Sequence, residues 1–345
     1  MSAGLARVTV VIPCYNYGHY LPAAVRSALE QPGVDVDVII VDDASPDGSV
    51  AVARALASRD ARVRVIEHEQ NRGHIRTYND GLAEVTGDYV VLLSADDLLA
   101  PGALARSTGL MRRHPRVGLV YGYAPEFSET PPPQLRARAR EQVWKGDRWL
   151  QRICDRGTNL IVNPEAILRR DVMDRLVGYD PDLPQTADME LWMRAAAISD
   201  VGRVAGPYQG FYRVHDANMH LTDYRGLLTE IRARRDTFTS FFDGPGAGLP
   251  RARERRDAAH RTLAAEAVRL ERVARAGGGG LDPDLADDFS AFAAETWPGI
   301  TATRLWRQTA TRRHRPPGAL RRAVESQVTS VTGALRWRRW RRYGL

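Results

Sequence analysis

Apolar runs and helical patterns alternate along the first 125 residues of the chain. Runs of β-branched and other apolar residues, typical of buried parallel strands, cover 8–13, 36–41, 63–66, 89–93 and 117–121. Between them, residues 20–30, 49–56, 75–85 and 104–111 repeat apolar positions at helical spacing. Strands joined by helices predict right-handed βαβ units, so we expect an α/β fold with a mostly parallel, Rossmann-like sheet flanked by helices.

The pattern changes beyond this region. Residues 125–140 contain three consecutive prolines and then alternating Arg and Ala, which indicates an exposed excursion. Further helices are expected over 149–154 and 187–197, and strand-like pieces over 160–168 and 210–215. From residue 221 the chain is helical and rich in Ala and Arg, with a glycine linker at 277–280. The sequence thus predicts an α/β domain over 1–220 and a helical, Arg-rich C-terminal region over 221–345.

The net charge of +7 is concentrated at the C-terminus. Residues 311–345 carry ten Arg and one Glu, or +9, so the preceding residues carry 7 − 9 = −2. A body without excess positive charge argues against nucleic acid as a partner. Within this tail, Trp337, Trp340 and Tyr343 alternate with arginines at helical spacing. The tail either docks its aromatic residues onto the body or makes peripheral contact with an anionic membrane.

Two cysteines, Cys14 and Cys154, stand far apart and outside any CxxC spacing. A reducing compartment is the simpler interpretation. The first residues lack the apolar region and cleavage site of a signal peptide, and no apolar run reaches the ~18 residues of a membrane span. We therefore expect a cytoplasmic protein, with peripheral contact at the inner membrane face through the tail.

Polar residues follow the predicted strands at their carboxyl ends, where open α/β sheets bind ligands. Asp42 and Asp43 come after the second strand, and carboxylates there can accept from uracil N3–H or from ribose hydroxyls. The alternative is a helix cap followed by a turn. Asp96 and Asp97 follow the fourth strand, and two adjacent carboxylates suit a hard cation such as Mg²⁺ or Mn²⁺ on a diphosphate. Their alternative role is also a helix cap.

The segment QTADMELWMRAA brings two further acids, Asp188 and Glu190, to the start of a predicted helix. Acids at i and i+2 do not share a helix face, so they should differ in role. One can act as a general base, while the other caps the helix or pairs with Arg194; simple acidic decoration of a helix start is the alternative. Arg213 and His215 alternate along a strand and can both face a phosphate or a metal.

Six segments occur in an order and spacing that resembles inverting glycosyltransferases of family 2, which have the GT-A fold. They are VVIPCYNYGHYLPAAVRSALEQ, IIVDDASPDGS, NRGHIRTYNDGL, GDYVVLLSADD, GYDPDLPQTADMELWMR and YRVH, and the resemblance covers about residues 7–220. It implies a nucleoside-diphosphate-sugar donor, usually UDP-linked, a divalent metal (Mg²⁺ or Mn²⁺), and single displacement with inversion. The acceptor, a glycan, a lipid-linked molecule or a small molecule, is expected to contact residues 125–185 and the C-terminal helices.

The resemblance also implies roles for individual residues. By position, Pro13, Tyr15 and Asn16 line the nucleotide pocket and Asp43 reads the base. Asp96 lies near the ribose and the metal, and Asp97 ligates the metal. Asp188 matches the catalytic base, and His215 matches a late histidine on the metal or diphosphate.

Three positions depart from the family pattern. Ser94 stands where Asp-x-Asp-Asp often begins, Ala187 replaces a Glu before the base, and Tyr78 replaces an Arg, leaving Arg76 and His74 as diphosphate partners. The missing acid at position 94 keeps open a catalytically degenerate scaffold or binding protein. A nucleotidyltransferase is disfavoured because the first strand leads into Pro-Cys-Tyr-Asn rather than a Gly-rich basic loop.

Overall fold

The computed structural model describes residues 4–161, 164, 166–216, 218, 226–276 and 281–311. The chain divides into two compact units, one formed by Met1–Trp149 and Leu160–Asn218, the other by Leu150–Asn159 and Met219–Leu345. The second unit thus includes a short segment from the middle of the chain that the sequence pattern did not indicate. The glycine linker at 277–280 and the aromatic tail lie outside the described residues.

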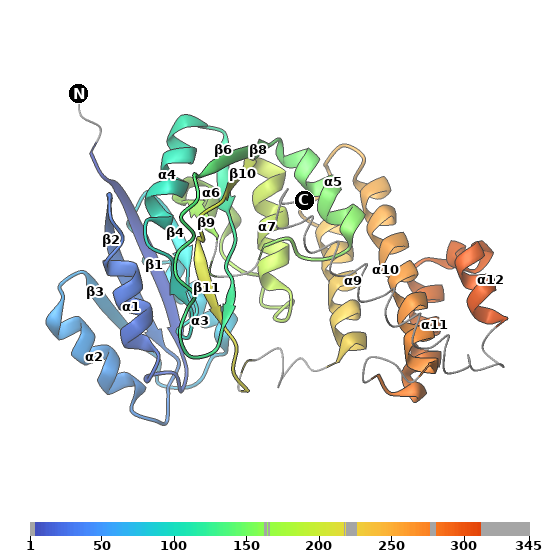
Figure 1. The fold of residues 1–345 in the computed structure, drawn as a ribbon, viewed down its shortest axis with the longest axis horizontal. Helices are drawn as coiled ribbons and strands as arrows, with labels where there is room; N and C mark the ends of the chain where they lie inside the picture. Colours follow the sequence, from blue (N-terminus) through green and yellow to red (C-terminus); the bar gives the residue numbers. More distant parts are fainter. Residues whose placement is uncertain are drawn as a thin grey trace. The chain divides into compact units, whose positions relative to one another are not determined.

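An eight-stranded sheet forms the centre of the first unit (Figure 1), with the strand order β3-β2-β1-β4-β9-β6-β10-β8. The pairs β1–β2, β1–β4, β2–β3 and β6–β10 are parallel, whereas β9 and β8 run antiparallel to their neighbours. The mostly parallel sheet is confirmed. The strands are β1 (Ala6–Cys14), β2 (Val34–Asp42), β3 (Val63–Glu67), β4 (Tyr89–Leu92), β6 (Val117–Tyr121), β8 (Arg140–Trp144), β9 (Ile167–Arg169) and β10 (Asp200–Ala205).

Helices cover both faces of this sheet because its central strands are apolar on both sides. Even-numbered residues of β1, such as Val10 and Ile12, belong to the core shared with α1 and α4. On the other face Gly81 of α3 lies so close that an added Cβ would come within 2.4 Å of Val11. The helices of this unit are α1 (Leu21–Leu29), α2 (Ser49–Arg59), α3 (His74–Leu82), α4 (Ala103–Arg113), α6 (Arg170–Leu176) and α7 (Ala187–Ile198), and α5 (Gly146–Arg156) begins in it.

Two strands were not predicted. Residues 140–144 form the edge strand β8 against β10, and of these only residue 140 belongs to the expected excursion over 125–140. No strand was predicted for β10, because Gly202 and Arg203 interrupt its apolar pattern. Gly202 is needed there because an added Cβ would come within 2.8 Å of Leu110, while Arg203 is buried with one guanidinium nitrogen on Gln142.

A second, three-stranded sheet lies beside the carboxyl end of β4. It consists of β5 (Leu98–Leu99), β11 (Gly210–Arg213) and β7 (Glu126–Phe127), with β11 in the middle. A small apolar cluster of Ala100, Phe127, Tyr208 and Phe211 supports it. Because β5 begins directly after Asp97, this sheet brings the end of β11 next to the acidic pair.

The second unit is helical, as predicted for the C-terminal region. Its helices are α9 (Leu227–Asp243), α10 (Ala252–Arg275), α11 (Ala286–Thr296) and α12 (Arg304–Ala310). Aromatic side chains such as Phe238, Phe241 and Phe289 fill its core. Within the described part of the chain, no helix is long and apolar enough to pass through a membrane.

Candidate functional site

Hydrogen bonds join the loop that follows β1 to the loop that follows β2. The backbone N–H of Asn16 donates to Ser45 Oγ at 3.0 Å, and that of Gly18 donates to Ser49 Oγ at 2.8 Å. Asp42 accepts from both the backbone N–H and the hydroxyl of Ser45. For Asp42 the turn interpretation is therefore the one that the contacts support.

Asn16 combines an unusual backbone with an available acceptor. Its φ of 60° lies in the left-handed region, which Asn tolerates better than most residues. Its Oδ1 atom is buried and has no hydrogen-bond partner among the described residues. Such an oxygen suits an N–H donor of a ligand. Of the other residues predicted in the nucleotide pocket, Pro13 is half-buried near the end of β1 and Tyr15 is exposed.

Asp43 is almost completely buried, at 3% exposure, and its carboxylate holds a later loop. Oδ1 accepts from His68 Nδ1 at 2.8 Å and from the backbone N–H of Arg72 at 2.7 Å, while Oδ2 accepts from that of Gly73 at 2.9 Å. Burial alone would raise the pKa of Asp43, but these hydrogen bonds outweigh burial and lower it. These three hydrogen bonds use three of the about four acceptor positions of the Asp43 carboxylate. A direct hydrogen bond between Asp43 and the nucleotide base stays a prediction.

Asp96 and Asp97 lie buried at the carboxyl end of β4. Asp97 Oδ1 accepts the backbone N–H of Arg213 at 2.8 Å, and Asp96 Oδ2 lies 3.0 Å from His215 Nε2. Burial first, and then the neighbouring Asp96 charge, raise the pKa of Asp97 well above its ordinary value. A bound divalent cation would offset both effects, so the pair fits a metal held by one or two carboxylates and by substrate phosphates.

His215 contacts an acid and an aromatic group. Its ring stacks on Tyr20 at 5.3 Å between centroids and meets Tyr17 edge-on at 5.5 Å. Across the described ranges, no cluster of three or more His, Cys, Asp or Glu residues is arranged to hold a metal. The predicted role of His215 as a direct ligand therefore remains a prediction, and the observed contact orients Asp96.

Asp188 lies in the first turn of α7 and is half-buried, with Oδ1 accepting the backbone N–H of Met189 at 2.7 Å. Tyr78 of α3, only 6% exposed, feels the charges of Asp188 and of the acidic pair. Burial raises the pKa of the Tyr78 hydroxyl, and the charges of Asp97, Asp96 and Asp188 raise it further. The charges of all three carboxylates thus reach one buried hydroxyl, while a common cleft for Asp43, Asp97 and Asp188 stays a prediction.

Glu190 pairs with Arg194, one of the two roles that its position suggested. The ion pair measures 2.6 Å and is nearly buried. Burial raises the pKa of Glu190, and the hydrogen bond and charge of Arg194 oppose that rise. The predicted diphosphate partner Arg76 is exposed on α3, and His74 Nε2 lies 3.2 Å from the carbonyl oxygen of Pro184.

Several residues that hold the site were not predicted. His68 and Asn79 are examples, because each bonds a partner at least 25 residues away in the sequence. Arg213 was predicted to face a phosphate or a metal, whereas its backbone N–H and its side chain both bond the acidic pair.

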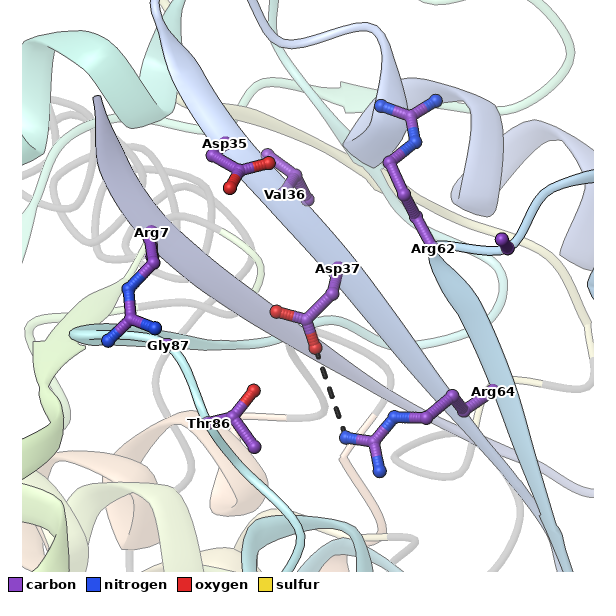
Figure 2. A pocket seen from close by; sticks show the side chains of 9 residues that line it. Arg7, Asp35, Val36, Asp37, Arg62, Arg64, Thr86 and Gly87 are labelled. Atoms are coloured by element: carbon purple, nitrogen blue, oxygen red, sulfur yellow. Dashed lines mark ion pairs between the residues drawn. The ribbon is translucent and has the colours of Figure 1, made fainter. Parts of the chain in front are cut away.

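A separate hollow of about 370 Å³ opens at the opposite edge of the sheet (Figure 2). It is lined by Arg7, Asp35, Asp37, Arg62 and Arg64, which lie near the amino ends of their strands. Arg64 and Asp37 approach to 4.0 Å there. Its place at the amino ends separates it from Asp96 and Asp97 at the carboxyl end of β4.

The sequence model of the family described as glycosyl transferase family 2 matches residues 9–177. The uncharacterized glycosyltransferase alr2836 of Nostoc sp. is 26% identical over 231 residues, which cover 63% of this chain and 67% of the relative. Glycosyltransferase GlyG of Streptococcus pneumoniae is 35% identical over 92 residues, 27% of this chain and 31% of the relative.

Solved structures share the fold. TarS 1–349 of S. aureus superposes with a TM-score of 0.58 at 14% identity, covering 88% of this chain and 91% of that one. The mannosyltransferase PcManGT of Pyrobaculum calidifontis, in complex with GDP-Man and Mn²⁺, gives a TM-score of 0.55 at 20% identity, with 94% and 88% coverage. The expected GT-A architecture, including helices after the sheet domain, is thereby confirmed.

Proposed function

This chain belongs to glycosyl transferase family 2, and from that premise we propose that it transfers a sugar from a nucleoside-diphosphate sugar to an acceptor hydroxyl with inversion. The observation that carries the proposal is the buried acidic pair Asp96 and Asp97 at the carboxyl end of β4, each held through one carboxylate oxygen, by His215 and by the backbone N–H of Arg213. A UDP-sugar is the proposed donor. TarS has been crystallised with UDP-GlcNAc, and PcManGT with GDP-Man, which makes a GDP-sugar the first alternative to test.

The nucleoside is proposed to bind between the loops after β1 and β2. Asn16 offers a buried acceptor oxygen, and Tyr15 an exposed ring that can pack on a base. Asp43 contributes by holding the loop 68–73, through Arg72 and Gly73. Arg76, exposed one helical turn further along, is the proposed diphosphate partner.

Asp97, supported by Asp96, is proposed to hold Mg²⁺ or Mn²⁺ against the donor diphosphate. When bound, the ion neutralises negative charge on the departing diphosphate. The residues fit this role because burial and the neighbouring charge of Asp96 both raise the pKa of Asp97. A bound divalent cation would offset both effects. His215 is proposed to keep Asp96 oriented through the 3.0 Å contact.

Asp188 is proposed as the general base. It takes the proton of the acceptor hydroxyl, whose oxygen attacks the anomeric carbon from the face opposite the diphosphate. The bond between that carbon and the diphosphate oxygen breaks, and the nucleoside diphosphate leaves. The hydrogen bond from the backbone N–H of Met189 helps to hold the Asp188 carboxylate at the start of α7.

The test is Asp188→Asn, compared with Asp182→Asn at an exposed acid in the preceding loop. We expect Asp188→Asn to lose transfer from a panel of UDP- and GDP-sugars by at least about 100-fold, the scale of a lost general base. Thermal stabilisation by UDP with Mn²⁺ should persist in both variants. Full transfer by Asp188→Asn would exclude Asp188 as the base. Stabilisation by no nucleoside diphosphate, with or without Mn²⁺, would favour the degenerate scaffold.

A further inference from the structure

Arg213, at the end of β11, is joined to both acids of the proposed metal site. Its backbone N–H donates to Asp97 Oδ1 at 2.8 Å, and its Nε donates to the backbone carbonyl of Asp96, also at 2.8 Å. Its Nη1 donates to the carbonyl of Ser128 at 3.0 Å, just beyond β7. One residue therefore connects the turn that carries Asp96 and Asp97 to the strands β7 and β11.

The guanidinium of Arg213 is also fixed by aromatic rings. It lies 4.7 Å from the centroid of Tyr20 and 4.4 Å from that of Phe127, and the residue is 9% exposed. Tyr20 is the same ring on which His215 stacks. A planar cation held between rings and bonded to two carbonyls has little freedom to turn toward a ligand.

Each acid of the pair has one carboxylate oxygen in a contact with β11 or the residues after it. The backbone N–H of Arg213 donates to Asp97 Oδ1, and His215 Nε2 contacts Asp96 Oδ2. Each carboxylate is thus oriented through one of its oxygens, and its second oxygen can face a cation. The permanent charge of Arg213 lies beside two buried carboxylates and lowers the pKa of Asp97 against the rise from burial.

We propose that Arg213 is a positioning residue that assembles the cation site, holding Asp96 and Asp97 for the divalent metal without contacting the donor. The inference rests on the metal-assisted part of the proposed function. Arginine is required rather than lysine, because its fork bonds two carbonyls at once and its flat face packs between two rings. The hydrogen bond from the backbone N–H of residue 213 to Asp97 also depends on the Arg213 side chain, because that side chain keeps the end of β11 in place.

The test compares Arg213→Met and Arg213→Lys with a matched control, Arg169→Met. Arg169 also donates to two backbone carbonyls, of Val117 and Met111, and lies 5.7 Å from the ring of Tyr89, but it does not contact the acids. Binding of Mn²⁺ to the full-length protein in the presence of UDP is measured by electron paramagnetic resonance. Thermal unfolding is recorded for each variant without ligands.

We expect Arg213→Met to weaken Mn²⁺ binding by about 10- to 100-fold, the range for partners that orient metal ligands, with Arg213→Lys in between. Arg169→Met should lower the melting temperature yet bind Mn²⁺ like the wild type. Wild-type affinity in Arg213→Met, or an equal loss in Arg169→Met, would overturn the inference. If Arg213→Met does not fold, a folded Arg213→Lys decides: weakened binding supports the inference and wild-type binding overturns it. A wild type that binds no Mn²⁺ with UDP overturns the metal-assisted step, and this inference with it.

Discussion

Positions 78 and 94 differ from the family pattern and touch each other in the structure. The hydroxyls of Tyr78 and Ser94 lie 3.5 Å apart, close to Asp96 and Asp97. In a chain with Arg at the first position and Asp at the second, the two charges would meet at the same place. The two departures are therefore best interpreted as one linked change, in which a neutral pair replaces an ion pair. On this interpretation, Ser94 removes an acid without leaving a cation unpaired.

The linked change predicts how the two positions respond to substitution. Ser94→Asp adds a third acid beside a buried pair, and Tyr78→Arg removes a buried ring that packs against Tyr179. We expect each to lower the free energy of unfolding by about 3 kcal/mol, the first through repulsion between buried like charges and the second through lost core packing. The double variant should recover at least about 1 kcal/mol of the summed loss, as contacting residues do. Urea denaturation measures all four proteins, and strictly additive effects would refute the linkage.

Residue contacts close in sequence were predictable, and distant ones were not. The Glu190–Arg194 pair follows from i,i+4 spacing on a helix and is present at 2.6 Å. The three donors to Asp43 come from residues 68–73, a loop whose path depends on the packing of β3 and α3. A strand-end carboxylate in the sequence looks the same whether it binds a ligand or a loop. This is why the sequence left the role of Asp43 open.

At the scale of elements, one turn joins α3 to the helix that carries the proposed base. Asn79 of α3 bonds both backbone groups of Tyr179, at 2.7 Å and 2.9 Å, and Arg194 of α7 donates to the carbonyl of Gly178 at 2.8 Å. Gly178 is required, because its φ is +82° and an added Cβ would come within 2.4 Å of Asn79 Oδ1. The preceding Val177 has a φ of 58° and is 85% exposed, a strained conformation for a β-branched residue.

We expect Asn79→Ala to release this turn and so disturb the start of α7. Removing the amide leaves the backbone of Tyr179 without two partners, which should lower the free energy of unfolding by about 1–3 kcal/mol. The turnover number should fall more than the affinity for UDP, because Asp188 moves while the nucleotide loops stay. Steady-state kinetics and UDP titration separate the two effects, and Gln151→Ala, at an exposed amide on α5, is the control. Loss of UDP affinity with unchanged turnover would contradict this account.

Elements with uninterrupted apolar patterns were predicted closely, and mixed ones were not. The fifth predicted strand, 117–121, coincides with β6, and every residue in it is buried. The edge strand β8 has no buried residue, so its pattern resembles a loop. The helix predicted over 75–85 ends at Leu82 in α3, three residues before its expected end. Strands that are buried on both faces of the sheet were thus the elements that the sequence predicted best.

At the scale of the whole molecule, charge is divided unevenly along the chain. The residues before 311 carry a net charge of −2 against +9 for residues 311–345. The acidic site lies in the first unit, whereas the basic excess lies in a tail outside the described residues. The tail carries Trp337, Trp340 and Tyr343 among its arginines, so it can bring both charge and interfacial aromatic rings to an anionic surface.

A tail of this composition should bind anionic membranes by charge and by interfacial aromatic residues. Each basic residue near an anionic surface contributes up to about 1 kcal/mol at low salt, so even partial engagement of ten arginines gives measurable binding. We expect the full chain to co-sediment with vesicles of phosphatidylglycerol and phosphatidylcholine, less at high salt, and not with phosphatidylcholine alone. A chain ending at residue 311 should not bind, and replacing Trp337 and Trp340 by Ala should weaken binding at any salt concentration. If the chain ending at residue 311 bound vesicles as well as the full chain, residues before the tail would make the membrane contact. Binding to neither vesicle would favour a tail that docks its aromatic residues on the protein itself.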